Sequence, residues 1–162
     1  MDKETTSTIN ILLIEDNPGD VRLMQEMLRD AKVHNCLHVV NDGEGAMSFL
    51  RREGTYSGVP QPDLILLDLN LPNKSGREVL REITNDPELK DIPVAVVTSS
   101  EDREDIIVSY RLGAKYYFTK PLRFEHLRQI VQSVEEFGFM IVKKGERDQI
   151  RDDFSTKSGL KV

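Results

Sequence analysis

The chain has 162 residues, of which 38% are hydrophobic and 31% charged, and its formal net charge is -6. This length fits one folded domain with a short appendage, and the acidic balance argues against binding to nucleic-acid phosphates, which needs clustered Lys and Arg. No apolar run reaches the roughly 18 residues of a membrane span, and residues 1–8 lack an apolar signal-peptide core, so we expect a cytoplasmic protein without membrane contact.

Short apolar runs alternate with helical patterns along the first part of the chain. Residues 9–14 are mainly apolar and predict a buried strand, and Asn17 followed by Pro18 predicts the start of a helix that ends near residue 32. Residues 37–40 predict a short edge strand, and a further helix opens after it near residue 42. A loop rich in Gly, Pro and Ser then leads to the next strand.

That next strand, residues 64–67, is wholly apolar and lies between turn formers, which is typical of a central strand covered on both faces. Ser75 and Glu78 have the spacing of a capping box and predict a helix that ends before residue 86. Two further strands are predicted at residues 94–98 and 116–119, each followed by a helix.

We expect the helix after residues 94–98 to turn Ile106, Ile107 and Tyr110 inward and to stop at Gly113. The single cysteine, Cys36, is expected to be a small buried apolar residue. Strands and helices that alternate with short connections predict an α/β fold, in which a doubly wound five-stranded parallel sheet carries helices on both faces.

Polar residues follow the carboxyl ends of four predicted strands. Because these ends meet at one edge of a parallel sheet, we expect the polar residues to share one crevice. They are Glu15, Asp16, Asp68, Thr98 and Lys120. Three carboxylates repel one another unless a cation lies between them, and oxygen ligands suit Mg²⁺. A Lys ammonium and a Thr hydroxyl can hold a phosphoryl oxygen, so the set predicts an aspartyl-phosphate site with Asp68 as the nucleophile.

A simpler interpretation remains for each of these residues taken alone. Asp68 could only cap a turn, Lys120 could be a solvated surface lysine, and Glu15 with Asp16 could interact with a helix dipole. The phosphorylation hypothesis depends on their occurring together at one sheet edge.

Five segments resemble the motifs of receiver domains of two-component response regulators. They are residues 11–17, 68–72, 75–76, 97–99 and 117–121, and the resemblance extends over roughly residues 9–140. It implies a flavodoxin-like sheet with the strand order 2-1-3-4-5. Residues 63–82, with the long loop before them, look most like the stand-alone regulators encoded with phytochrome-type histidine kinases.

The resemblance implies a role for each matching residue. Asp68 would accept a phosphoryl group from a phosphohistidine of the sensor histidine kinase. Asp16, Asp68 and the backbone carbonyl of Asn70 would bind Mg²⁺ directly, and Glu15 would act mostly through a bound water. Many members carry Asp at the position of Glu15, and the extra methylene should leave the metal site intact.

On the phosphoryl side, Lys120 and Thr98 would contact the phosphoryl oxygens, and Tyr117 would be the aromatic switch that moves with Thr98. The bond between Lys120 and Pro121 would be cis. We therefore expect a single-domain response regulator that catalyses only its own Mg²⁺-dependent phosphorylation and dephosphorylation, and that signals through a change of its surface.

Two alternatives belong to other functional classes. A haloacid-dehalogenase-like phosphohydrolase normally carries a second Asp two residues after its nucleophile, where this chain has Asn70. A flavin-binding module of the same fold would place a hydroxyl-rich phosphate loop after the first strand, where Glu15 and Asp16 repel phosphate.

The last predicted helix holds more apolar residues than one sheet face can cover. The surplus is Phe137, Phe139, Met140, Ile141 and Val142. An exposed patch of this kind predicts a homodimer formed through the last helix, unless the helix end folds back on its own domain. We expect residues 1–143 to form the receiver domain and residues 144–162 to form a C-terminal tail without fixed structure.

Overall fold

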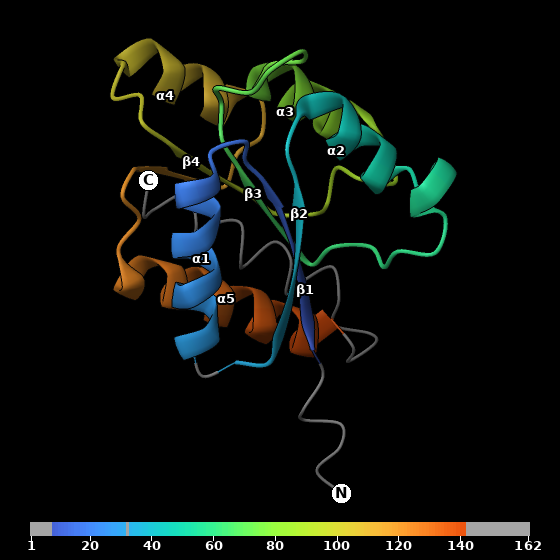
Figure 1. Ribbon diagram of the computed structural model, residues 1–162, viewed down its shortest axis with the longest axis vertical. Coiled ribbons are helices and arrows are strands. Elements are labelled where there is room, and N and C mark those ends of the chain that lie inside the picture. Colours follow the sequence, from blue (N-terminus) through green and yellow to red (C-terminus); the bar gives the residue numbers. More distant parts are fainter. Residues whose placement is uncertain (1–7, 32, 142–162) are drawn as a thin grey trace, which may run out of the picture.

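A parallel sheet forms the centre of the molecule (Figure 1). The computed structural model describes residues 8–31 and 33–141, with side chains up to Val134. Within this part of the chain, five strands pair in the order β2-β1-β3-β4-β5, so the predicted fold class and strand order are confirmed. The strands are β1 (Ile9–Ile14), β2 (Asn35–Val40), β3 (Leu64–Leu67), β4 (Val94–Thr98) and β5 (Tyr116–Thr119).

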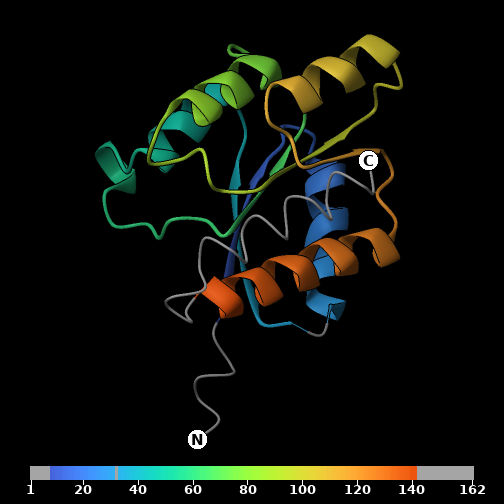
Figure 2. The same cartoon turned by 180° about the vertical axis from the view of Figure 1, so that it is seen from behind.

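Helices cover both faces of the sheet, as alternating strands and helices require. Helices α1 and α5 lie on one face, and α2, α3 and α4 lie on the other (Figures 1 and 2). Their bounds are α1 (Pro18–Asp30), α2 (Gly43–Leu50), the 3-10 helix η2 (Gly54–Tyr56), α3 (Gly76–Asn85), α4 (Arg103–Arg111) and α5 (Phe124–Ile141).

Two of the predicted helix starts are formed by the side-chain caps that the sequence indicates. Asn17 accepts a hydrogen bond from the backbone N–H of Asp20 at 3.0 Å, and Pro18 occupies the first helical position of α1. Ser75 and Glu78 form the capping box of α3 in both directions. These caps set where α1 and α3 begin, and each is the first helix after a strand end that carries polar residues.

The core consists of two hydrophobic layers, one on each face of the sheet. All four side chains of β3 are fully buried, because successive residues of a strand point to opposite faces and both faces are covered. Leu64 and Leu66 pack toward α1 and α5, whereas Ile65 and Leu67 pack toward α2 and α3. Full burial stabilises the fold by roughly 1.5–3 kcal/mol for each such side chain. Polar side chains are therefore left to the ends of the strands.

The prediction that Ile107 faces inward on α4 is wrong. Ile107 is 44% exposed, Ile106 and Tyr110 are half-buried, and the fully buried side chain of this helix is Ser109. Helix α4 lies near the edge of the sheet above the short strand β5, so it covers less apolar surface than α3 does. Gly113 ends the helix as predicted, with a φ of 110° that favours glycine.

The expectation of a buried Cys36 is also wrong, because this residue is exposed. Strand β2 begins at Asn35 rather than at residue 37, so Cys36 belongs to the edge strand. Cys36 points to the same face as His38, which contacts Phe49 of α2. Helix α2 is short and covers His38, but it leaves the start of β2 in contact with solvent.

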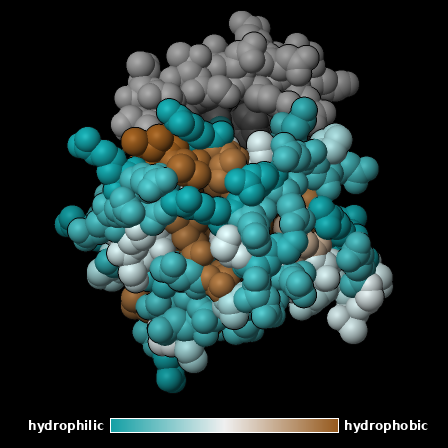
Figure 3. All heavy atoms as spheres, turned by 90° about the horizontal axis from the view of Figure 1, so that it is seen from above, coloured by the Kyte–Doolittle hydropathy of each residue, from teal (hydrophilic) through white to brown (hydrophobic). Residues whose placement is uncertain are grey.

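The surface is largely polar. Figure 3 shows a mainly hydrophilic face on which hydrophobic side chains gather in small patches. In the described part of the chain the exposed large hydrophobic residues are Leu23, Ile107 and Phe124. Among the described residues, no helix is both long and apolar enough to cross a membrane.

We predict that Gly76→Ala destabilises the protein by about 1–3 kcal/mol, because there is no space for an added methyl group. A Cβ atom at Gly76 would lie 2.5 Å from the carbonyl oxygen of Asp68 and from the Cα of Leu69. Helix propensity alone predicts the opposite sign, since Ala is favoured over Gly by about 1 kcal/mol in helices. Urea unfolding measures the change.

The matched control is Gly58→Ala, since a Cβ atom there meets nothing within 4 Å. We expect this control to change the unfolding free energy by less than about 0.5 kcal/mol. Equal effects of the two substitutions would show that the close approach of α3 to the backbone of Asp68 has no energetic importance.

Candidate functional site

The carboxyl ends of the strands bring the predicted site residues to one edge of the sheet. The backbone N–H of Asp68 donates to the carbonyl of Ile14 at 3.1 Å, which extends the pairing of β3 with β1 by one residue. The backbone N–H of Lys120 donates to the carbonyl of Thr98 at 2.8 Å and does the same for β5 and β4. The residues that follow these strands are therefore held at the same level of the sheet.

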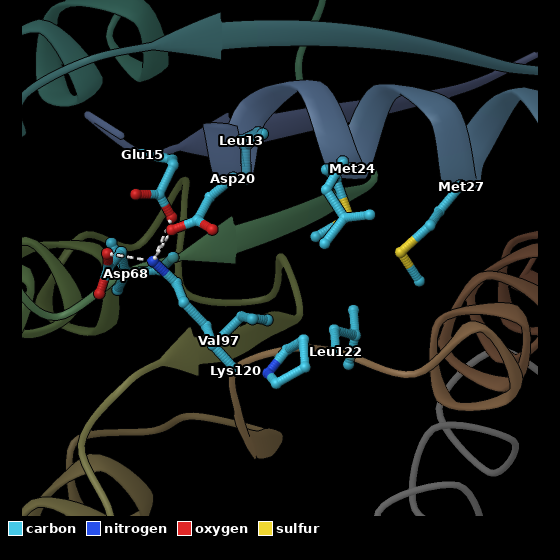
Figure 4. Close-up of a pocket in the computed structure, with 12 residues that line it drawn as sticks. Leu13, Glu15, Asp20, Met24, Met27, Asp68, Val97, Lys120 and Leu122 are labelled. Carbon is cyan, nitrogen blue, oxygen red and sulfur yellow. Dashed lines mark hydrogen bonds and ion pairs between the residues drawn. The ribbon is translucent and has the colours of Figure 1, made fainter. Parts of the chain in front are cut away.

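Lys120 lies at the centre of the site and contacts three carboxylates (Figure 4). Its Nζ is 2.9 Å from Glu15 Oε1, 2.7 Å from Asp20 Oδ2 and 2.9 Å from Asp68 Oδ2. Burial alone would lower the pKa of Lys120, but the bonds to the three carboxylates raise it well above its usual value. The ammonium is therefore permanently charged. The Lys120-Pro121 bond is cis, as the resemblance implied.

Asp20 is the site residue that sequence analysis missed. It lies in the first turn of α1, where an acidic residue is common because it interacts favourably with the helix dipole. Its side chain nevertheless turns toward Lys120, which is 100 residues away in the chain. No local pattern indicates that contact, because it depends on the Lys120 side chain, which follows β5, reaching the first turn of α1.

Glu15, Asp16 and Asp68 form a group that can hold a metal ion. One oxygen from each carboxylate lies within 4.8 Å of the others, and Glu15 and Asp68 are buried whereas Asp16 is exposed. Burial raises the pKa of Glu15, and the hydrogen bond from Lys120 opposes that rise. Hard divalent cations prefer such oxygen ligands, so the donor set fits the predicted metal.

Asn70 and Glu15 also bond to the backbone around this group. The backbone N–H of Asn70 donates to Asp68 Oδ1 at 3.1 Å, and the Asn70 residue is exposed. Glu15 Oε2 accepts the backbone N–H of Asn17 at 3.1 Å. The carboxylates of Asp68 and Glu15 are thus held on one side by backbone donors and on the other by Lys120.

Thr98 is fully buried, and its hydroxyl has no hydrogen-bond partner among the described residues. Leaving a buried hydroxyl unpaired costs about 1–3 kcal/mol, so a ligand or a water that bonds to it would remove this cost. Val96 pairs with Leu67 in the sheet, which places Thr98 beside the residues that follow β3. The hydroxyl can therefore receive a ligand at the Asp68 side of the crevice.

Tyr117 lies one strand further toward the edge of the sheet. Its phenol donates to the carbonyl of Ser100 at 3.0 Å, and its ring packs against Tyr110. Burial raises the pKa of Tyr117, so the phenol keeps its proton and remains a donor at neutral pH. Tyr117 is thereby connected to the loop that leaves Thr98.

An apolar pocket continues from the polar end of the site along α1 (Figure 4). Met24, Met27 and Leu122 line the end of the pocket away from the carboxylates, and Lys120 lies where the pocket meets the carboxylates. The apolar wall keeps water from one side of the ammonium, which strengthens its interaction with the carboxylates.

Comparison with known proteins agrees with the family resemblance found in the sequence. A family model described as "Response regulator receiver domain" matches residues 11–132. The response regulator Rcp1 of Synechocystis sp. is 46% identical over 137 residues, which cover 85% of this chain and 93% of Rcp1.

Two solved structures are similar over most of the chain. The phosphorylated cyanobacterial phytochrome response regulator RcpA is 50% identical, with a TM-score of 0.71, and the match covers 81% of this chain and 94% of RcpA. The Mn²⁺-bound form of Rcp1 is 47% identical, with a TM-score of 0.69, and the match covers 80% and 93% of the two chains.

We predict that Lys120→Met destabilises the metal-free protein by about 1–3 kcal/mol near neutral pH, because the carboxylates then have no facing cation. Without the bond from Lys120, the pKa of Glu15 rises further above its unfolded value. An acid whose folded pKa is raised binds protons preferentially in the native state, so the loss should shrink as the pH falls toward about 5. Urea unfolding at both pH values measures this.

Lys90→Met is the control, since Lys90 is an exposed lysine on the protein surface. It should change the unfolding free energy by less than about 0.5 kcal/mol at either pH. A loss in Lys120→Met that is independent of pH would contradict an origin in the carboxylates.

Proposed function

Because the chain belongs to the response regulator receiver domain family, we propose that Asp68 accepts a phosphoryl group from a phosphohistidine of a sensor histidine kinase. The observation that carries this proposal is the buried Asp68 carboxylate, 2.9 Å from the Lys120 ammonium and within the group of carboxylates able to hold a metal. The protein is a response regulator and not a conventional enzyme, as predicted. That RcpA has been solved in a phosphorylated form supports the same chemistry here.

In the proposed step, a carboxylate oxygen of Asp68 attacks phosphorus, and the bond between phosphorus and the imidazole nitrogen of the kinase breaks. The electron pair of that bond stays on the imidazole, and Asp68 becomes an acyl phosphate. Lys120 holds a phosphoryl oxygen through its ammonium, and the unpartnered hydroxyl of Thr98 donates to another. Positioning and charge neutralisation supply most of the catalysis in reactions of this kind.

The metal that we propose for this site is Mg²⁺. Asp16, Asp68 and the backbone carbonyl of Asn70 would hold it directly, and Glu15 would act through a water. When bound, the ion would offset the charge of the carboxylates and of the phosphoryl oxygens. The Mn²⁺ in the Rcp1 structure supports a divalent cation in this family.

The proposed signal is a change of the surface around β4 and β5. Once the Thr98 hydroxyl has bonded to a phosphoryl oxygen, the loop from Thr98 to Ser100 adopts a new position. Tyr117 bonds to the carbonyl of Ser100, so it would move with this loop and act as the aromatic switch. Tyr110 on α4 packs against Tyr117, and the exposed Ile107 lies on the same helix, so α4 would transmit the change to a partner.

The kinase that we propose is of the phytochrome type. RcpA is described as a phytochrome response regulator, and a bacteriophytochrome response regulator, RtBRR, is 37% identical to this chain with a TM-score of 0.70. Residues 63–82, which suggested this class from the sequence, contain the phosphoacceptor and the start of α3. Phosphotransfer from such a kinase would take place in the cytoplasm.

We predict that acetyl phosphate with Mg²⁺, or a phosphorylated phytochrome-type kinase, adds one phosphoryl group to the wild type. Intact-mass measurement of fresh protein should show this single addition, and Asp68→Asn should abolish it because an amide is not a nucleophile. Asp30→Asn is the control, since Asp30 is an exposed residue at the end of α1 and should leave the labelling intact. Full labelling of Asp68→Asn would assign the phosphoryl group to another residue.

We also propose a homodimer formed through the last helix, with residues 1–143 as the receiver domain and residues 144–162 as its tail. The side chains of Phe137, Phe139, Met140 and Ile141, and the whole of Val142, lie outside the described residues. The proposal therefore rests on their apolar character, with support from Phe124 at the start of α5, which is 37% exposed.

We predict that wild type sediments as a dimer, and that Phe137→Glu combined with Ile141→Glu sediments as a monomer, since buried carboxylates disfavour an apolar interface. Glu125→Gln, a charge change at the exposed start of the same helix, is the control. A wild type that is monomeric both with and without beryllofluoride, or a dimer unaffected by the two Glu substitutions, would refute this interface.

A further inference from the structure

The loop between β3 and α3 is closed where it meets the two elements. The backbone N–H of Gly76 donates to the carbonyl of Leu69 at 3.0 Å, and Gly76 packs so closely that an added Cβ would lie 2.5 Å from the carbonyl oxygen of Asp68. Inside the loop, the backbone N–H of Asn70 donates to Asp68 Oδ1 at 3.1 Å. The loop is therefore fixed at both ends and borders the Asp68 carboxylate.

Helix α2 contacts this loop at Lys74. Helices α2 and α3 lie side by side on one face of the sheet (Figures 1 and 2). Gly43, the buried first residue of α2, has no space for a side chain, because a Cβ there would collide with the carbonyl oxygen of Lys74 and lie 2.7 Å from the Cβ of Lys74. Asn73 adds a second contact by donating to Asp42 Oδ2 at 3.4 Å.

An atom added at Gly43 would displace the loop rather than α2. Helix α2 is anchored by four apolar side chains that are at most 3% exposed, and moving it would open the core; these are Ala46, Met47, Phe49 and Leu50. Asn70, Pro72 and Asn73 are exposed and can move into water. Because both ends of the loop are fixed, residues 70–73 must take up a displacement of Lys74.

We propose that Gly43 is a positioning residue for the divalent cation. By letting Lys74 approach α2, it keeps residues 70–73 where the backbone carbonyl of Asn70 can serve as a ligand. Mg²⁺ requires a nearly ideal octahedral arrangement of its ligands, so a displaced carbonyl weakens binding. This inference rests on the metal site proposed above and extends its support to a helix that supplies none of the proposed ligands.

The test is binding of Mn²⁺ to wild type and to Gly43→Ala, followed by the loss of the paramagnetic resonance signal of the free ion. Mn²⁺ takes the same kinds of oxygen ligand as Mg²⁺. Substituting a residue that supports a metal ligand commonly weakens binding 10–100-fold. Because Gly43 acts through a loop, we expect the Kd for Mn²⁺ to rise by the smaller of these factors, about tenfold.

Ala46→Gly is the control for an effect of stability alone. Ala46 is fully buried in the same helix, and glycine there lowers helix propensity and leaves a small void, but it adds no atom beside Lys74. We expect its Kd for Mn²⁺ to stay close to that of wild type, with both proteins folded by circular dichroism.

Asn73→Gly tests the same loop without crowding it. Asn73 has a φ of 69°, which glycine adopts without strain, and the substitution removes the bond to Asp42. One exposed hydrogen bond contributes little, so we expect the Kd for Mn²⁺ to rise about twofold. This variant decides the question if Gly43→Ala does not fold.

A second measurement needs no metal. In ¹H–¹⁵N spectra of the metal-free protein, the amide signal of Asn70 should shift in Gly43→Ala and keep its wild-type position in Ala46→Gly. An unshifted Asn70 signal in folded Gly43→Ala, wild-type Mn²⁺ affinity in that variant or in Asn73→Gly, or an equal loss in Ala46→Gly would overturn the inference. If wild type itself does not bind Mn²⁺, the proposed metal site is refuted.

Discussion

The interaction on which the site depends is the attraction between one buried ammonium and the carboxylates around it. Glu15 and Asp68 are almost fully buried, and two such charges at one sheet edge would repel each other strongly in a medium of low polarity. Lys120 offsets this repulsion, and in turn the carboxylates keep its ammonium charged. Because Lys120 and Asp68 are 52 residues apart, the balance exists only when the whole sheet has formed.

The rest of the fold holds the Lys120 ammonium and the carboxylates around it in these positions. The strands fill both hydrophobic layers with apolar side chains, so charged groups are excluded from every part of the sheet except its ends. Helix α3 comes so close to the backbone of Asp68 that Gly76 has no space for a side chain. Helix α1 delivers Asp20 to Lys120 from the other side of the sheet. A rigid frame of this kind holds the Asp68 carboxylate in place before any ligand arrives.

The site also contains a hydrogen-bonding group without a partner among the described residues. The hydroxyl of Thr98 is buried without a partner in the described part of the chain, while the Lys120 ammonium contacts three carboxylates. A phosphoryl group on Asp68 would supply an acceptor to the Thr98 hydroxyl. Phosphorylation would thus change the contacts at the end of β4.

The amino-acid sequence by itself determined the elements and the residues at the strand ends. Hydrophobic periodicity, the caps at Asn17 and Ser75, and the parallel arrangement were sufficient to bring Glu15, Asp16, Asp68, Thr98 and Lys120 to one edge, because each signal is local in the chain. Tertiary structure alone decided the orientation of α4, the exposure of Cys36 and the contact of Asp20 with Lys120. The first two features depend on which surfaces the neighbouring helices leave uncovered. The third joins residues 100 positions apart in the chain. A pattern of neighbouring residues in the sequence predicts neither kind of feature.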